Sequence, residues 1–317
     1  MLRYIANRLL MMVPTLIGVA IITFFILRIV PGDIVEVKMR ADGAAVSIEA
    51  IEAERARLGL DKPLPVQFAD WMRGLVTLDL GQSMWTGRPV ISEIATRFQL
   101  TFEIAILATL FAVLVAVPLG TVSALWRGTW IDYAVRLITM GGLALPTFWV
   151  GLLLLMGLLW FFNWLPPINF TPIYRDPLAN ISQLIWPAMV VGYRFAAVLA
   201  RLIRSSLLEI LNEDFIRTAR AKGASERKIV WVHALGNALL PAITVVGLEF
   251  AFLIGGLVVT EQVFNLNGLG KLFIQAISHN DYTMIQGMVM LFATVYVIAN
   301  LAVDLLYAAI DPRVRYR

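Results

Sequence analysis

Few side chains in this sequence could carry out covalent chemistry. It contains no cysteine and only two histidines, His233 and His279. The run Gly268-Leu269-Gly270-Lys271, followed by Leu272, lacks the spacing of a G-x-x-x-x-G-K-[ST] phosphate-binding loop. A G-x-S-x-G nucleophile motif is also absent from the sequence. We therefore expect no catalytic site, no metal site and no cofactor bound by this chain, which should not hydrolyse ATP itself.

Charged residues inside apolar segments are the remaining candidates for chemistry. Arg194 and Glu249 lie near the middles of two long apolar runs. A charge at the centre of a lipid-embedded helix costs roughly 3 kcal/mol unless it faces water or a partner. Opposite charges at matching depth predict either a buried structural pair or two groups that line a path for a charged or zwitterionic solute.

The elements that position these charges are predicted to be membrane-spanning helices. Hydrophobic residues make up 59% of the 317 residues and charged residues 15%, whereas soluble domains have about a quarter charged residues. Crossing the hydrocarbon core takes about 20 apolar helical residues. Six segments meet this requirement: Leu9 to Val30, Leu100 to Trp126, Tyr133 to Phe162, Trp186 to Ile203, Leu239 to Val259 and Met284 to Ile310. Because barrel-type alternation is missing, the predicted fold class is all-α, a polytopic membrane protein with six transmembrane helices.

The orientation of these spans follows from the basic residues of the short loops, which stay on the cytoplasmic side. With six spans both termini share one side, and most basic residues fall there: Arg3, Arg8, Arg127, Arg201, Arg204, Arg217, Arg220, Lys222, Arg227, Lys228, Arg313, Arg315 and Arg317. We therefore expect both termini in the cytoplasm. The first span lacks a cleavage motif and is read as an uncleaved anchor. The net charge of +4 is explained by topology and anionic lipid headgroups and needs no nucleic acid.

The predicted spans divide the chain into four parts. These are the N-terminal cytoplasmic tail with the first transmembrane helix (1–30), an extracytoplasmic segment (31–99), a five-helix core (100–310) with a cytoplasmic loop at 204–236, and a cytoplasmic tail (311–317). In the extracytoplasmic segment, Ser47 predicts the start of a short helix that Gly59 ends, and a second short helix is expected over Gln67 to Leu78. The segment is either a small outer cap or a packed excursion.

The cytoplasmic loop is predicted to begin with a short basic helix. Asn212, Glu213 and Asp214 supply capping and acidic residues at its start, and Gly223 is a typical terminator. Ile216, Ala219 and Ala221 are expected to give it a narrow face of small residues. Such a helix is either an ordinary amphipathic surface element or a docking surface for another subunit.

At this loop the chain resembles the permease subunits of ATP-binding-cassette (ABC) importers, specifically the B-type permeases of the dipeptide, oligopeptide and nickel group. The residues that carry the resemblance are Thr218-Ala219-Arg220-Ala221-Lys222-Gly223, His233-Ala234-Leu235, Asn237-Ala238-Leu239-Leu240-Pro241, Leu58-Gly59-Leu60-Asp61-Lys62-Pro63, Asp79-Leu80-Gly81, Ser83, Arg88-Pro89-Val90, Glu261-Gln262-Val263-Phe264 and Gly268-Leu269-Gly270. They follow the family order along essentially the whole chain.

The resemblance implies a type I ABC importer permease fold in a bacterial inner membrane. It implies that Arg217, Thr218, Ala219, Arg220, Ala221, Lys222 and Gly223 form an EAA-like coupling loop that contacts the ATPase. It further implies a second homologous permease, two ATP-binding subunits that hold ATP and Mg²⁺, and an extracytoplasmic solute-binding protein. The expected solutes are di- or oligopeptides or similar small molecules.

The chain departs from the family pattern at three places. Arg217-Thr218-Ala219 stands where general importers have Glu-Ala-Ala, Asn267 replaces a usual proline, and Glu249 replaces a neutral polar residue. The first departure looks like the variant of the peptide group, and the other two leave the details of the solute open. The solute remains open among dipeptides, longer peptides, nickel chelates and opine-like compounds. An ion-gradient-driven secondary transporter is the alternative, although the sequence lacks the inverted repeats and broken midplane helices that this class predicts.

Overall fold

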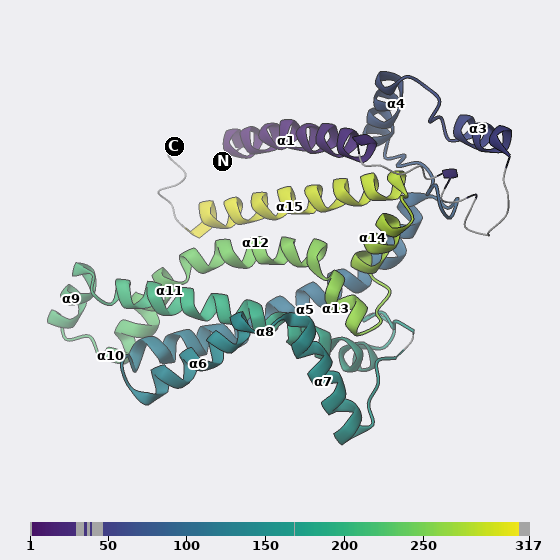
Figure 1. Ribbon diagram of the computed structural model, residues 1–317. Helices are drawn as coiled ribbons and strands as arrows, with labels where there is room; N and C mark the ends of the chain where they lie inside the picture. Colours follow the sequence, from purple (N-terminus) through teal and green to yellow (C-terminus); the bar gives the residue numbers. More distant parts are fainter. Residues whose placement is uncertain (1, 30–34, 37–38, 40–46, 168, 311–317) are drawn as a thin grey trace. The chain divides into compact units, whose positions relative to one another are not determined.

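The computed structural model describes residues 2–29, 35–36, 39, 47–167 and 169–310 (Figure 1). The regular secondary structure of these residues is helical, apart from one isolated bridge between Gln82 and Pro89, and turns and loops connect the helices. The predicted tail 311–317 and parts of the predicted segment 31–99 lie outside the described residues. The chain divides into two compact units, Met1–Gln99 with Asn267–Ile298 and Leu100–Leu266 with Ala299–Arg317, and each unit is described separately.

The second unit is organised around one long helix, α8. Its helices are α5 (Val90–Leu125, from Leu100 on), α6 (Trp130–Ala144), α7 (Thr147–Phe162), α8 (Pro177–Ile210), α9 (Asp214–Ala221), α10 (Glu226–Lys228), the π-helix η1 (Ile229–Ala234), α11 (Leu235–Ala238), α12 (Leu240–Gly256) and α13 (Val258–Val263). Helix α8 packs against α6, α7, α11, α12 and α13, and it contributes the largest set of buried residues. Its N-cap residue is Asp176, whose carboxylate accepts hydrogen bonds from the N–H groups of Leu178 and Ala179.

The predicted span from Tyr133 to Phe162 is not one straight helix. It divides into α6 and α7, which meet at an angle of 104°. Leu145, between them, is extended because Pro146 follows it, and a residue before proline avoids the helical conformation. Within the described ranges, four helices are long and apolar enough to cross a membrane singly, and the count rises to six if each of the two bent pairs is one span. Six spans were predicted from the sequence.

The first unit contains α1 (Leu2–Ile29), α3 (Ile48–Arg57), α4 (Leu64–Thr77), α14 (Leu269–Ser278) and α15 (Tyr282–Ile310) as far as Ile298. The predicted caps of α3 are confirmed, because the Ser47 side chain accepts a hydrogen bond from the Ala50 N–H at 3.3 Å and Gly59 has a φ of +68°. Helix α4 starts earlier than predicted, at Leu64, since Pro65 fits the first turn of a helix.

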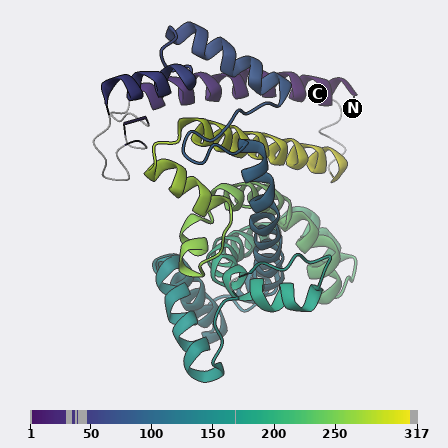
Figure 2. The same cartoon turned by 90° about the vertical axis from the view of Figure 1, so that its right-hand side faces the viewer.

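Aromatic side chains attach α4 to the end of α1. The ring of Phe24 lies 5.1 Å from that of Phe68 and stacks at 5.8 Å on Trp71. The two helices lie next to one another in both views (Figures 1 and 2). Such ring pairs contribute about 0.5–1.5 kcal/mol each beyond the area they bury, so α4 has a fixed position at the end of α1.

A buried carboxylate fixes the start of α15. Asp281, 2% exposed, accepts hydrogen bonds from the Ser83 hydroxyl, the Met84 N–H at 3.0 Å and the Met284 N–H at 3.1 Å. It thereby caps α15 and holds the turn around Ser83 against it. The neighbouring His279 ring lies 4.0 Å from the ring of Trp85.

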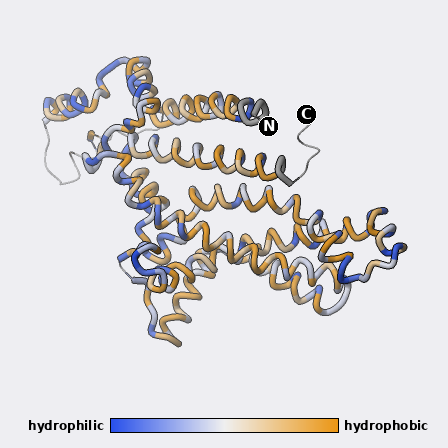
Figure 3. Tube along the Cα trace, turned by 180° about the vertical axis from the view of Figure 1, so that it is seen from behind, coloured by the Kyte–Doolittle hydropathy of each residue, from blue (hydrophilic) through white to orange (hydrophobic). Residues whose placement is uncertain are grey.

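The first part of the loop between α8 and α12, which contains α9, is hydrophilic, in contrast to the apolar α8 and α12 that flank the loop (Figure 3). Helix α9 begins at Asp214, where Asn212, Glu213 and Asp214 predicted a start, and it ends before Gly223, as predicted. After α10 the chain widens into the six-residue π-helix η1. The sequence did not predict this wider turn.

The close approach of α5 and α8 predicts a glycine requirement. A Cβ at Gly192 would meet the Ala108 carbonyl oxygen at 2.8 Å, whereas one at Gly157 on α7 would meet nothing within 4 Å. Gly192→Ala should lower the free energy of unfolding by about 1–3 kcal/mol through overpacking. The control Gly157→Ala should be neutral or up to about 1 kcal/mol stabilising. Thermal unfolding of the two purified variants in detergent measures the difference, and equal melting temperatures would contradict the packing argument.

Candidate functional site

The predicted coupling segment contains a short helix, α9, with well-defined ends. Asp214 lies in its first turn and Arg220 in its last, so both charges are favourable to the helix dipole. Gly223 adopts a φ of +81°. The N–H groups of Gly223 and Ala224 donate to the carbonyl oxygens of Arg220 at 2.9 Å and Ala219 at 3.2 Å. This is a Schellman ending, and it needs a residue that tolerates the left-handed conformation.

One side of α9 packs against the rest of its unit. Ile216 is fully buried, with a relative exposure of 0%, in a cluster that includes Leu207 of α8 and Ile229 of η1. Ala219 and Ala224 pack against the same cluster. Because α9 is held from two neighbouring elements, it is expected to move together with the end of α8.

The opposite side of α9 is exposed and carries an aromatic ring. Phe215 is 45% exposed, and Thr218, Ala221 and Lys222 are exposed beside it. The sequence predicts Ala219 and Ala221 on one face of small residues, but Ala219 packs inward while Ala221 is exposed. The exposed Phe215 was not predicted, although a single large aromatic residue in a hydrophilic helix is a signal for it. An aromatic presented on a fixed helix is typical of an interface anchor.

Two of the predicted coupling residues are already engaged in ion pairs within the loop. Arg217 contacts Asp214 at 3.1 Å, and both side chains are largely exposed. Arg220 donates to Glu226 at 2.8 Å and so joins α9 to α10. This hydrogen bond is the main reason that the pKa of Arg220 is raised above its ordinary value. The guanidinium therefore stays charged and oriented toward α10.

A buried ion pair connects α6 to α8 just before α8 leads into α9. Asp132, 1% exposed, accepts hydrogen bonds from Arg204 Nε and Nη2, both at 2.9 Å. Ser123 Oγ and the Gly128 N–H donate to it as well, at 2.6 and 3.0 Å. Bidentate pairs of this kind are the stronger ones. From the sequence, Arg204 contributed only to the predicted orientation of the spans, and no role was predicted for Asp132. A carboxylate in the first turn of an apolar span is itself a signal that a partner is needed.

Arg194 and Glu249 are not paired with one another. Arg194, on α8, is exposed in this chain, and Glu249, on α12, is partly exposed. Within the described part of the chain, no hydrogen bond or ion pair joins the two, and neither has another polar partner. The described residues therefore do not contain the predicted buried structural pair. The other interpretation, two groups that line a path for a solute, stays a prediction.

Other membrane-segment carboxylates do have partners. Glu103 of α5 accepts a hydrogen bond from the Asn180 amide at 2.5 Å. Glu261, with an exposure of 0%, accepts one from the Thr101 hydroxyl at 2.7 Å. Since lipid offers no hydrogen bonds, such satisfied groups hold helices together. Arg194 and Glu249 differ from them, because neither has a polar partner among the residues that the structure describes.

Two family models match the chain. The model of the binding-protein-dependent transport system inner membrane component covers residues 116–316, and the model of the N-terminal part of such a component covers residues 1–105. The chain belongs to this family. It is the permease component of a binding-protein-dependent ABC importer, as the resemblance predicted. Members of this family are transport permeases rather than enzymes, and the apolar helices agree with a multi-pass protein of the inner membrane.

Relatives match the permease over its full length. It is 40% identical over 317 residues, covering 100% of both chains, to the glutathione transport system permease protein GsiC of Pectobacterium atrosepticum. It is 39% identical, with the same coverage, to the protein of that name from Escherichia coli K12.

Solved structures confirm the predicted fold. The permease matches an inward-facing structure of the MetNI methionine ABC transporter with a TM-score of 0.52 and 20% identity, over 70% of this chain and 97% of that chain. It matches an amino acid ABC transporter determined with histidines with a TM-score of 0.50 and 16% identity, over 70% and 94%. At these identities the likeness establishes the type I ABC importer permease fold.

The Asp132–Arg204 pair predicts a large stability difference within the permease. Arg204→Gln leaves a buried carboxylate without its charge partner and should cost about 3–5 kcal/mol of unfolding free energy. The control Arg217→Gln breaks a pair whose side chains are 71% and 91% exposed, so it should cost less than about 1 kcal/mol. Chemical denaturation of the two variants in detergent measures both, and a comparable loss from each would contradict the role of the buried pair.

Proposed function

We propose that this permease imports peptides or similar small solutes, driven by ATP hydrolysed in separate subunits that dock on the exposed face of α9. The observation that carries the proposal is the two-sided character of α9. Its inner residues, Ile216 and Ala219, attach it to the end of α8, while its outer residues, Phe215 and Ala221, are exposed. A partner subunit that binds the exposed side of α9 can therefore move the membrane helices to which α9 is attached.

The same arrangement supports the proposed partners. Two ATP-binding subunits hold ATP and Mg²⁺, and their closure pulls on α9 of this chain and of a second homologous permease. Movement of a two-state element by a ligand bound elsewhere is what coupling between distant sites requires. An extracytoplasmic solute-binding protein delivers the solute. In this arrangement α9, the N-terminus and the C-terminus all face the cytoplasm, which the distribution of basic residues favours.

The relatives and the unpaired charges support the proposed solute. The relatives are named as glutathione transport permeases, and glutathione is a small peptide with both carboxylate and ammonium groups. Arg194 and Glu249 offer the complementary charges, and neither is neutralised within the described residues. We place both on the translocation path, where water and the passing solute compensate for the cost of burying them.

The docking of the ATPase predicts that outer-face variants lose it. Phe215→Asp removes the aromatic anchor and Ala221→Trp blocks close approach. Loss of such an anchor typically costs about 2 kcal/mol or more, roughly a 30-fold weaker association. Co-purification of the ATPase subunits with the tagged permease measures the effect. Val76→Asp, at an 81% exposed position of α4, is the matched control and should retain the ATPase.

Retention of the ATPase by both outer-face variants would contradict this docking surface. ATP-independent uptake by the permease alone, reconstituted in vesicles with an ion gradient, would instead favour a secondary transporter and overturn the proposed energy source.

The translocation path predicts that charge removal impairs transport without impairing assembly. Arg194→Gln and Glu249→Gln, made separately, should each reduce solute uptake by about tenfold, because a hydrogen bond to a charged group contributes about 1.5–3 kcal/mol. Uptake into proteoliposomes that contain the complete complex measures this. Arg175→Gln, at an exposed loop position, should transport normally. Failure of the Arg194 and Glu249 variants to assemble would show that these residues are structural.

A further inference from the structure

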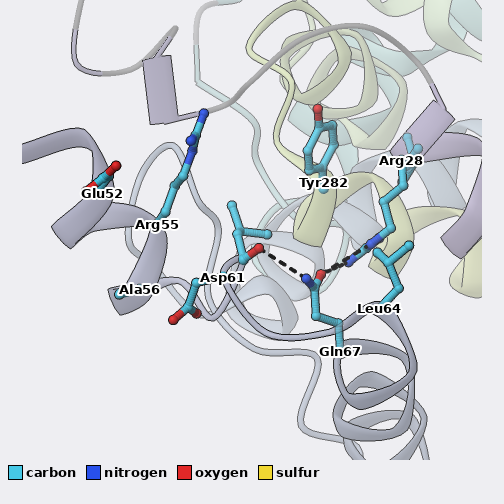
Figure 4. A pocket seen from close by; sticks show the side chains of 10 residues that line it. Arg28, Glu52, Arg55, Ala56, Asp61, Leu64, Gln67 and Tyr282 are labelled. Atoms are coloured by element: carbon cyan, nitrogen blue, oxygen red, sulfur yellow. Dashed lines mark hydrogen bonds between the residues drawn. The ribbon is translucent and has the colours of Figure 1, made fainter. Parts of the chain in front are cut away.

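The first unit contains a polar cavity that the proposed coupling and translocation sites do not use. It has a volume of about 750 Å³ and opens between the end of α1, the helices α3 and α4, and the first residue of α15 (Figure 4). Its polar lining residues are Arg28, Glu52, Arg55, Asp61, Gln67 and Tyr282. Cavities of this size are typical of small-molecule sites, which fix a ligand through a few convergent polar groups.

The hydrogen-bond acceptors of Arg28 among the described residues are neutral. Its Nη1 donates to the Phe24 carbonyl oxygen at 3.2 Å, and its Nε and Nη2 donate to Gln67 Oε1 at 3.3 and 3.0 Å. Its guanidinium carbon lies 3.5 Å from the centre of the Phe24 ring. None of the described residues places a carboxylate within ion-pair distance of Arg28. The half-buried positive charge therefore has a fixed orientation, and the described part of the chain supplies no counter-charge for it.

Gln67 fixes that orientation from the other side. Its amide nitrogen donates to the carbonyl oxygens of Leu60 at 3.2 Å and Lys62 at 2.8 Å. The amide oxygen must then point toward Arg28, as Figure 4 shows. A guanidinium fixed in advance loses little freedom when an anion binds, so the arrangement favours capture of a carboxylate.

The rim of the cavity carries charges of both signs. Glu52 on α3 and Asp61 after it are exposed, and Arg55 of α3 lines the same space (Figure 4). An amphoteric molecule can therefore place its carboxylate on Arg28 while its ammonium group lies toward Glu52 or Asp61.

We propose that this cavity is a binding site for the carboxylate end of a peptide-like amphoteric solute, with Arg28 as the anchoring residue. The proposal rests on the proposed function, under which this end of α1 faces the outside of the cell. The site would hold solute before it enters the membrane path, at a position distinct from Arg194 and Glu249.

The test measures glutathione binding to the complete permease complex in nanodiscs, without the solute-binding protein. Arg28→Gln should raise the Kd by about tenfold, the loss typical of one charge-assisted hydrogen bond. The diamide of glutathione, which lacks both carboxylates, should bind the wild type at least as weakly as glutathione binds Arg28→Gln. The Arg28→Gln substitution should raise the Kd of the diamide little further. The matched control is Arg57→Gln on α3, a largely exposed arginine paired with Glu54, which should bind like wild type.

A second variant keeps the proposal testable if Arg28→Gln fails to assemble. Gln67→Glu supplies a carboxylate next to Arg28 and should abolish glutathione binding while the complex remains assembled. Unchanged binding by Gln67→Glu and Arg28→Gln, absence of binding by wild type, or an equal loss in Arg57→Gln would each overturn the inference. Weakened docking of the ligand-free binding protein with unchanged glutathione affinity would also overturn it, by assigning Arg28 to a protein carboxylate.

Uptake assays separate this inference from the proposed function. ATP-dependent uptake by wild type combined with unaltered glutathione binding in Arg28→Gln would reject the cavity alone. Absence of ATP-dependent uptake by the complete wild-type complex for every peptide offered would reject the proposed function.

Discussion

The bidentate pair between Arg204 and Asp132 connects the loop that carries α9 to the membrane helices. Asp132 is almost completely buried on α6, and its hydrogen-bond partners among the described residues lie on α5, on α8 and in the turn before α6. Six residues beyond Arg204, α8 ends at Ile210 and leads into α9. A force applied to α9 therefore reaches α6 and α8 together, because a buried pair of this geometry resists separation far more than an exposed one.

Three arginines illustrate how compensation differs with role. Arg204 is neutralised by a carboxylate and is structural. Arg28 is held by neutral oxygens and an aromatic ring, and Arg194 has no polar partner within the described residues. An uncompensated charge in a protein of this class is expensive. Such a charge is tolerated where a ligand, water or a partner subunit supplies the compensating charge or hydrogen bonds.

Local signals in the sequence predicted much of the fold. Ser47 and Gly59 bound α3, and Gly223 ends α9, because caps depend on neighbouring residues alone. The break between α6 and α7 before Pro146 was not predicted, since hydropathy does not distinguish a straight span from a bent one. The site was predicted less completely. Phe215 and Asp132 acquire their roles through burial and tertiary contacts, which spacing along the chain does not reveal.

The π-helix η1 has a consequence for the helix that follows it. A regular helix turns by about 100° for each residue, and a π-turn accommodates one residue more than an α-turn. The stretch Ile229–Ala234 therefore resets the angular register between α10 and α11, whereas α12 follows only after a break with a bend of 46°. The direction in which α11 presents its buried residues Leu235 and Ala238 thus depends on a single surplus residue in the preceding turns, and a deletion there would rotate that face.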